Sequence, residues 1–151
     1  MPVRRLNALL FVAALTVPLA AQSQSPPMGP SPKSPIRDGK TLYVAAWGSQ
    51  SFFRLSRGQT PVKRDSVPLG FRVDNIRWAP DGSILAAGQG GVAPMQTSNV
   101  VKIDPNTLKV QEIIRHPNSP EFGAGTVAVL IGKDLWVGSF RGDRIAIFPV
   151  P

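Results

Sequence analysis

The sequence contains no cysteine, and this absence sets the first limit on its chemistry. A chain without cysteine forms no disulfide, holds no metal through thiolates and has no cysteine nucleophile. The absence does not exclude an oxidising compartment, because exported proteins need not contain disulfides. With 151 residues, 42% of them hydrophobic, the chain has enough apolar material for one modest domain and too little for two.

Sustained helical periodicity and long apolar runs are also missing beyond the N-terminus. The apolar run 9–17 follows Arg4 and Arg5 and ends at Pro18, where a stretch of small residues begins. This pattern predicts a Sec-type signal peptide over residues 1–23. Its apolar core is about half of the ~20 residues needed to span a bilayer, so no stable membrane anchor is expected after cleavage. We expect an exported protein, periplasmic or secreted; the alternative is an N-terminal helix packed in the domain.

Proline and serine dominate residues 24–39, where apolar side chains are scarce. Such a segment cannot bury enough surface to offset its ordering entropy, and proline favours extended polyproline II. We therefore expect a disordered Pro/Ser-rich linker here. The folded domain is expected over residues 40–151.

A clustered basic surface is absent too, although the chain carries a net charge of +8. Removal of the signal peptide lowers that charge by two, and the remaining basic residues are scattered without interleaved aromatics. No nucleic-acid partner is expected, and the surface is predicted to be solvated and moderately cationic. The glycine-rich segment 88–91 is no phosphate loop, because neither a helix nor a Lys-Ser/Thr pair follows it.

What is present is a repeated pattern: a small and apolar strand, a glycine-bearing loop and a second strand. The three repeats are residues 42–55, 84–103 and 135–148. Their first strands start about 43 and then about 50 residues apart, a spacing typical of four-stranded propeller blades. Apolar inner strands are expected at 73–78 and 125–131, and alternating outer strands at 62–67 and 108–114. The sequence predicts an all-β fold, a partial β-propeller of about two and a half blades.

An acid and an amide, Asp74 and Asn75, lie at the start of an inner strand that is otherwise apolar. In a propeller this end of the strand faces the central channel, and several polar or glycine-bearing loops frame the same mouth. These are loops 48–51, 88–98 and 139–143 and the connection 115–125, which carries His116, Asn118 and Glu121. The alternative is structural: Asp and Asn often cap strand-end amides or form an Asx-turn.

Two motifs resemble a known family: VDNIRWAPDGSILAAG (73–88) and GTVAVLIGKDLWVGSFRGDRIAIF (125–148). They are similar to the C-terminal blades of six-bladed calcium-dependent propellers. These are the paraoxonase/arylesterase group and the senescence marker protein/gluconolactonase/strictosidine synthase superfamily. The resemblance covers roughly residues 41–151 and implies that Asp74 and Asn75 ligate calcium in the channel. The pair suits that ion, because calcium takes six to eight hard oxygen ligands.

The resemblance implies an exported calcium-dependent hydrolase of lactones or carboxylic esters, possessing a gluconolactonase-like or arylesterase-like activity. In such enzymes the ion polarises the substrate carbonyl and stabilises the oxyanion that develops. The family's remaining ligands come from earlier blades, which residues 40–151 do not contain. The catalytic base is unknown; His116 and Glu121 are candidates, although polar residues are ordinary in such a loop.

Two other functions stay open. One is a non-catalytic ligand-binding or protein-binding scaffold of the cell envelope that uses loop 88–98, and the other is a truncated or inactive member of the family. Because two and a half blades leave strand edges unpaired, another chain or self-association is expected to complete the propeller. The tryptophans Trp47, Trp78 and Trp136 are expected to pack between blades, with Trp47 also near enough to the mouth to contact a ligand.

Overall fold

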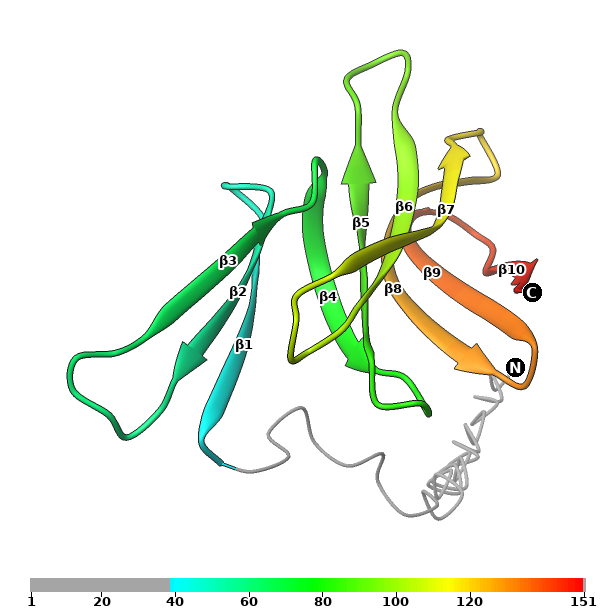
Figure 1. Ribbon diagram of the computed structural model, residues 1–151. Coiled ribbons are helices and arrows are strands. Elements are labelled where there is room, and N and C mark those ends of the chain that lie inside the picture. The colour runs from blue at the N-terminus through cyan, green and yellow to red at the C-terminus, as the bar shows by residue number, and fades with distance from the viewer. Residues whose placement is uncertain (1–38, 151) are drawn as a thin grey trace, which may run out of the picture.

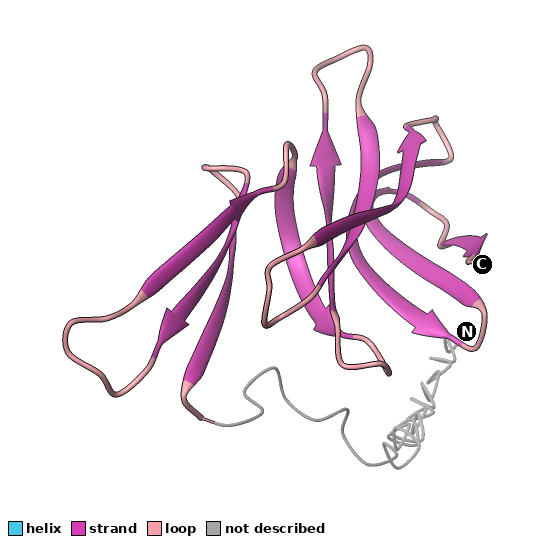
Figure 2. Cartoon of the chain, viewed as in Figure 1, coloured by secondary structure: helices cyan, strands magenta, loops and turns pink. Residues whose placement is uncertain are grey.

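The computed structural model describes residues 39–150, and these residues form strands and turns without any helix (Figures 1 and 2). The strands are β1 (Thr41–Ala46), β2 (Ser51–Ser56), β3 (Arg64–Pro68), β4 (Arg72–Trp78), β5 (Ile84–Gly90), β6 (Thr97–Ile103), β7 (Val110–Pro117), β8 (Phe122–Ile131), β9 (Asp134–Gly142) and β10 (Ala146–Pro149). The all-β expectation is confirmed, and the described part has no helix able to cross a membrane. The predicted signal peptide, 1–23, and all but the last residue of the predicted linker, 24–39, lie outside the described residues.

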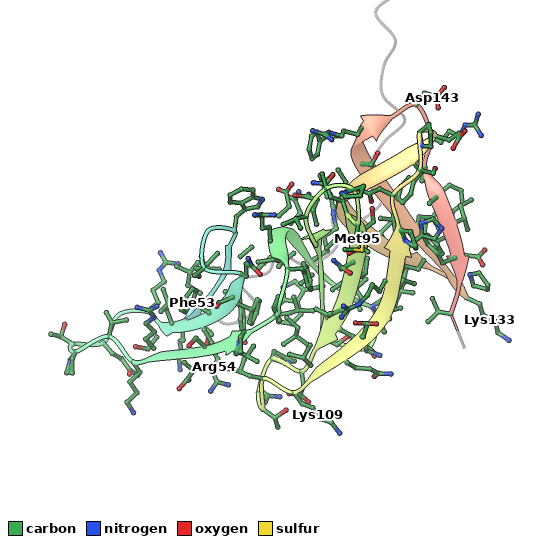
Figure 3. The ribbon with its side chains drawn as sticks, turned by 90° about the horizontal axis from the view of Figure 1, so that it is seen from above. Phe53, Arg54, Met95, Lys109, Lys133 and Asp143 are labelled. Carbon is green, nitrogen blue, oxygen red and sulfur yellow. The ribbon has the colours of Figure 1, made fainter. Side chains whose placement is uncertain are left out.

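Three antiparallel sheets make up the fold. The first sheet has the order β1-β2-β3, the middle sheet β4-β5-β6-β7 and the third sheet β10-β9-β8. β1 contacts β4, and β4 contacts β8. The first strand of each sheet therefore lies near the first strand of the next sheet. Figure 3 looks down on this arrangement, with Phe53 of the first sheet on the left and Lys133 and Asp143, in the turns that connect the strands of the third sheet, on the right.

Two hydrophobic clusters hold the sheets together, one on each face of the middle sheet. Phe52 of β2 packs on Ile84 and Ile103 between the first and middle sheets. Val100 packs with Val137 between the middle and third sheets. Because β5 is covered on both faces, its first residues, Ile84 to Ala87, are all apolar instead of alternating. β6 is buried on both faces as well, but it includes the buried polar residues Ser98 and Asn99.

The segment 88–91, expected as part of a loop, instead belongs mostly to β5. A Cβ atom on Gly88 would lie 2.0 Å from the main-chain oxygen of Arg72 in β4. Glycine at this position therefore permits close approach of two backbones, and the loop between β5 and β6 shortens to residues 91–96.

The connection 115–125, expected as one long loop, is also mostly strand. β7 continues through His116 and Pro117, which pair with Ser98 and Thr97 of β6, and β8 begins at Phe122. Proline is tolerated there because β7 is the edge strand of its sheet, where one side needs no hydrogen-bond donor. Only residues 118–121 remain as the connecting loop.

Candidate functional site

Several loops leave the sheets at one end, the upper end in Figure 1. They join β1 to β2, β5 to β6, and β7 to β8. β4 starts at this end, and its pairing with β5 shifts between Val73 and Asn75, so that Asp74 has no cross-strand partner. Such β-bulges redirect a side chain, and here both Asp74 and Asn75 are exposed. The expected pair therefore lies at the upper end of β4, the first strand of the middle sheet.

Hydrogen bonds fix the orientation of the Asn75 amide. Its Nδ2 donates to Oδ1 of Asp74 at 3.2 Å and to the main-chain oxygen of Thr126 in β8 at 3.0 Å. Among residues 39–150, Oδ1 of Asn75 accepts no hydrogen bond, and the Asp74 carboxylate forms no ion pair. An amide oxygen and a carboxylate are thus left for a ligand.

These two donors suit calcium by type, because calcium prefers carboxylate and carbonyl oxygens. Their number is too small for a complete site, since the ion takes six to eight oxygens. The described residues contain no group of three or more His, Cys, Asp or Glu side chains that could hold a metal. Asp74 and Asn75 fit one part of a calcium site, and the described residues bring no further carboxylate group to it.

A buried polar network supports the upper end and was missed by sequence reasoning. The Gly125 N–H of β8 donates to Oγ of Ser98 at 2.9 Å, and the Ser98 hydroxyl donates to Oδ1 of Asn118 at 3.1 Å. Gln89 Nε2 donates to the main-chain oxygen of Gly125 at 3.0 Å. Ser98 lies between Thr97 and Asn99, so no local sequence signal marked it as buried. This network joins the middle and third sheets directly beside Thr126.

The rim of the upper end carries an aromatic ring and a cation. Trp47 is 53% exposed, so it does not pack between sheets as Trp78 does, and its Nε1 lies 3.5 Å from Oε1 of Gln89. The Arg72 guanidinium lies 5.2 Å from the centre of the Trp47 ring. Figure 3 shows Met95, on the β5–β6 loop, over the middle sheet. Trp47, Arg72 and Gln89 thus form a cluster beside the start of β4 that is able to contact a small ligand.

His116, a candidate base, lies away from Asp74. Its ring packs against Phe148 and Phe122, with centroid separations of 5.3 and 6.1 Å. Its Nδ1 is buried and has no hydrogen-bond partner among the described residues. β7 is three strands from β4 in the middle sheet, about 14 Å at ~4.8 Å per strand. The structure therefore does not bring His116 and Asp74 together.

Glu121, the other candidate, is exposed in the loop between β7 and β8. The Ser119 hydroxyl, together with the Glu121 backbone, holds the pKa of Glu121 below its usual value. A lowered pKa makes the carboxylate a weaker base, so this environment does not favour Glu121 as a general base.

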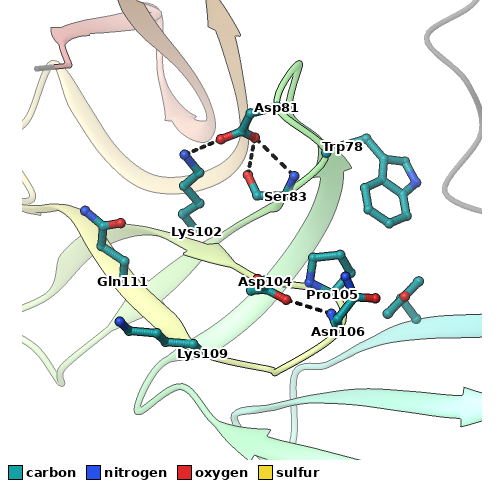
Figure 4. A pocket seen from close by; sticks show the side chains of 11 residues that line it. Trp78, Asp81, Ser83, Lys102, Asp104, Pro105, Asn106, Lys109 and Gln111 are labelled. Carbon is teal, nitrogen blue, oxygen red and sulfur yellow. Dashed lines mark hydrogen bonds and ion pairs between the residues drawn. The ribbon is translucent and has the colours of Figure 1, made fainter.

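A cavity of about 580 Å³ lies at the opposite, lower end (Figure 4). Asp81 accepts hydrogen bonds from the backbone and hydroxyl of Ser83 and forms an ion pair with Lys102. Trp78 meets Tyr43 edge to face at 5.5 Å beside it. Trp78 lies four positions after Asp74 in β4, about 13 Å along a strand, so this cavity is distinct from the upper end.

The upper end combines a bulged carboxylate, an oriented amide and an exposed aromatic ring, whereas Asp81 in the lower cavity is paired with Lys102. The upper end is therefore the candidate functional site. No protein-family model and no curated protein matches the chain. The case for the site consequently rests on its own residues and geometry.

Proposed function

We propose that this chain is an exported propeller protein related to calcium-dependent lactone and ester hydrolases of the gluconolactonase and arylesterase type. Its three sheets would be consecutive blades of a six-bladed-type propeller, with Asp74 and Asn75 as the calcium ligands of this segment. The observation that carries the proposal is the bulge at Asp74. It interrupts the pairing of β4 with β5 and leaves a carboxylate there without a cationic partner in the described part.

Each residue of the pair would have a separate part in binding. Asp74 provides negative charge, and Asn75 provides a neutral oxygen that adds no repulsion. Thr126 and Asp74 engage the Asn75 nitrogen, which leaves the amide oxygen for the ion. When bound, calcium would polarise a lactone or ester carbonyl and stabilise the developing negative charge.

The rim supports a small, oxygen-rich ligand. The face of Trp47 can pack on a ring, and the Arg72 guanidinium beside it donates hydrogen bonds to carbonyl or carboxylate oxygens. The side-chain nitrogen of Gln89 donates a hydrogen bond to the Gly125 main-chain oxygen, so the side-chain oxygen of Gln89 faces Trp47. The rim would orient the ligand while the Asp74 site holds its carbonyl.

Thermal unfolding with calcium and with excess EDTA tests the metal site. A ligand at 100 times its Kd stabilises a protein by about 2.7 kcal/mol, a shift of several degrees in Tm for a domain of this size. We expect calcium to raise Tm for the wild-type chain and for Glu112→Gln, an exposed acid of β7 that pairs with Arg115. We expect no rise for Asp74→Asn. An equal rise in Asp74→Asn contradicts the proposal.

Turnover then tests the reaction. We expect EDTA-sensitive hydrolysis of a simple lactone or aryl ester, lost in Asp74→Asn and retained in Glu112→Gln. Hydrolysis that survives both EDTA and Asp74→Asn contradicts calcium-dependent catalysis at this site.

A second candidate function is a non-catalytic binding scaffold of the cell envelope, and one observation favours it. Val92 and Met95 of the β5–β6 loop are 66% and 76% exposed. Large apolar side chains on an exposed loop suit contact with another molecule. If calcium leaves Tm unchanged and no ester or lactone is hydrolysed, the scaffold becomes the better account.

A further inference from the structure

The third sheet has one face that nothing in the described part covers. Val129, Trp136 and Ile147 lie opposite one another across β8, β9 and β10. Val129 is 40% exposed and Ile147 50%, and Ile131 and Ile145 on the same face are also exposed. The opposite face of this sheet packs on the middle sheet. We name the uncovered surface the β8–β10 face.

The first sheet has an uncovered face as well. Leu42 pairs with Leu55, and Val44 pairs with Phe53, so these four side chains share one side of β1 and β2. Leu42 is 43% exposed. The other side of the two strands, which includes Phe52, packs on the middle sheet. We name this surface the β1–β2 face.

The middle sheet shows how such faces are normally covered. The repeat that relates residues 42–55 to 84–103 aligns the β1–β2 face with four residues of β5 and β6. These are Ile84, Ala86, Val101 and Ile103, each no more than 4% exposed. They are buried because the first sheet packs on them. The β1–β2 face therefore has the same side-chain pattern as the face of the middle sheet on which the first sheet packs.

The β8–β10 face occupies the complementary position. In the middle sheet the side that bears Leu85, Ala87 and Val100 is covered by the third sheet. The repeat places Trp136 and Ile145 of the β8–β10 face at the positions of Leu85 and Val100. The two uncovered faces are thus the two halves of the sheet-to-sheet contact that already occurs twice within the chain.

Charge at the lower edge of the two faces is of opposite sign. Arg64 pairs with Leu55 beside the β1–β2 face, and its guanidinium lies 4.2 Å from the centre of the Phe53 ring. Asp134 pairs with Ile131 on the β8–β10 face. An acid on one face and a base on the other favour contact between unlike faces over contact between like ones.

We propose that a second copy of this chain covers both faces, and that the Asp74–Asn75 pairs of the two copies then share one calcium ion. Each copy places its β8–β10 face on the β1–β2 face of the other, so one twofold axis satisfies both contacts. The second part rests on the proposed function. Two chains would contribute two carboxylates and two amide oxygens, which can supply the roughly six oxygens that calcium requires at minimum.

Mass measurement by light scattering and native mass spectrometry, in EDTA, tests the pairing of the faces. We expect twice the chain mass for the wild type and the single-chain mass for Leu42→Lys and for Ile147→Glu. Both positions are about half exposed in one chain, so the substitutions should leave its Tm nearly unchanged. The control Val62→Glu, 60% exposed and on neither face, should keep twice the chain mass.

Mixing the two variants tests which faces meet. A Leu42→Lys chain and an Ile147→Glu chain can form one unaltered contact and one contact in which lysine meets glutamate. We expect a mixed two-chain species that neither variant forms alone. A wild type of single-chain mass at ~100 µM, far above the Kd of a stable dimer, overturns the inference. A Leu42→Lys chain that still has twice the chain mass also overturns the inference.

Calorimetric titration with calcium separates this inference from the proposed function. We expect one ion for every two chains. An ion bound by a chain of single mass supports the proposed function and overturns the shared site. A dimer that binds no calcium supports the pairing of faces and overturns both the shared site and the proposed calcium function.

Discussion

The backbone N–H of Gly125 donates a hydrogen bond to Oγ of Ser98 at 2.9 Å, and this buried bond joins the third sheet to the middle sheet. Ser98 is 0% exposed, and its own hydroxyl hydrogen goes to Asn118 in the loop before β8. The Ser98 hydroxyl thus positions β8 at Gly125. The next residue of β8, Thr126, accepts the hydrogen bond from the Asn75 amide. The candidate site depends on this contact between sheets.

Replacing Ser98 by alanine should lower the free energy of unfolding by about 1–3 kcal/mol, because the Gly125 N–H would stay buried without an acceptor. Urea unfolding measures the loss. Ser51→Ala is the matched control: the Ser51 hydroxyl bonds only to Ser49 in an exposed turn, so we expect a change within about 0.5 kcal/mol. Equal losses in the two variants would show that the contact between sheets contributes nothing.

Gly88→Ala should destabilise the protein by about 3 kcal/mol or more, because the new Cβ would lie 2.0 Å from the Arg72 oxygen and 2.8 Å from the Val73 Cα. Both neighbours are backbone, so relief requires β4 and β5 to separate next to the Asp74 bulge. Differential scanning calorimetry measures the change. Gly48→Ala, with nothing within 4 Å of its Cβ, should leave Tm nearly unaltered. A Gly88→Ala protein as stable as Gly48→Ala contradicts this packing.

Acid should weaken the fold through Asp81. The Lys102 ammonium and the Ser83 hydroxyl lower the pKa of Asp81 from 3.8 to about 2. As pH falls below about 4, the unfolded chain takes up this proton before the folded chain does, so stability is lost progressively down to about pH 2. Above that window the contribution is complete. Because Asp81 is half exposed, we expect at most ~1 kcal/mol.

Urea unfolding between pH 5 and pH 2 measures this effect. Asp81→Asn should flatten the acid limb of the stability profile, while Asp134→Asn should leave it in place. High salt should also reduce the contribution of Asp81, because the Lys102 pair is partly solvated. An unchanged acid limb in Asp81→Asn would show that other carboxylates govern acid unfolding.

Strand positions could be predicted because their signals are local. Ala79-Pro80-Asp81-Gly82 forms the expected turn: the Gly82 N–H donates to the Ala79 oxygen at 3.0 Å, and Gly82 has a φ of 86°. The connection 115–125 was expected as a loop because proline and glycine interrupt it. Pairing of His116 with Ser98 extends β7 through it, and that pairing depends on a strand about 18 residues away.

The sequence by itself determined the all-β class, the position of most strands and the exceptional place of Asp74 and Asn75, since alternation and turn chemistry act between near neighbours. Tertiary structure decided the orientation of the Asn75 amide by Thr126, the separation of His116 from Asp74 and the two uncovered faces. These features come from contacts between strands up to about 50 residues apart. Packing of whole sheets, and not local preference, sets such contacts.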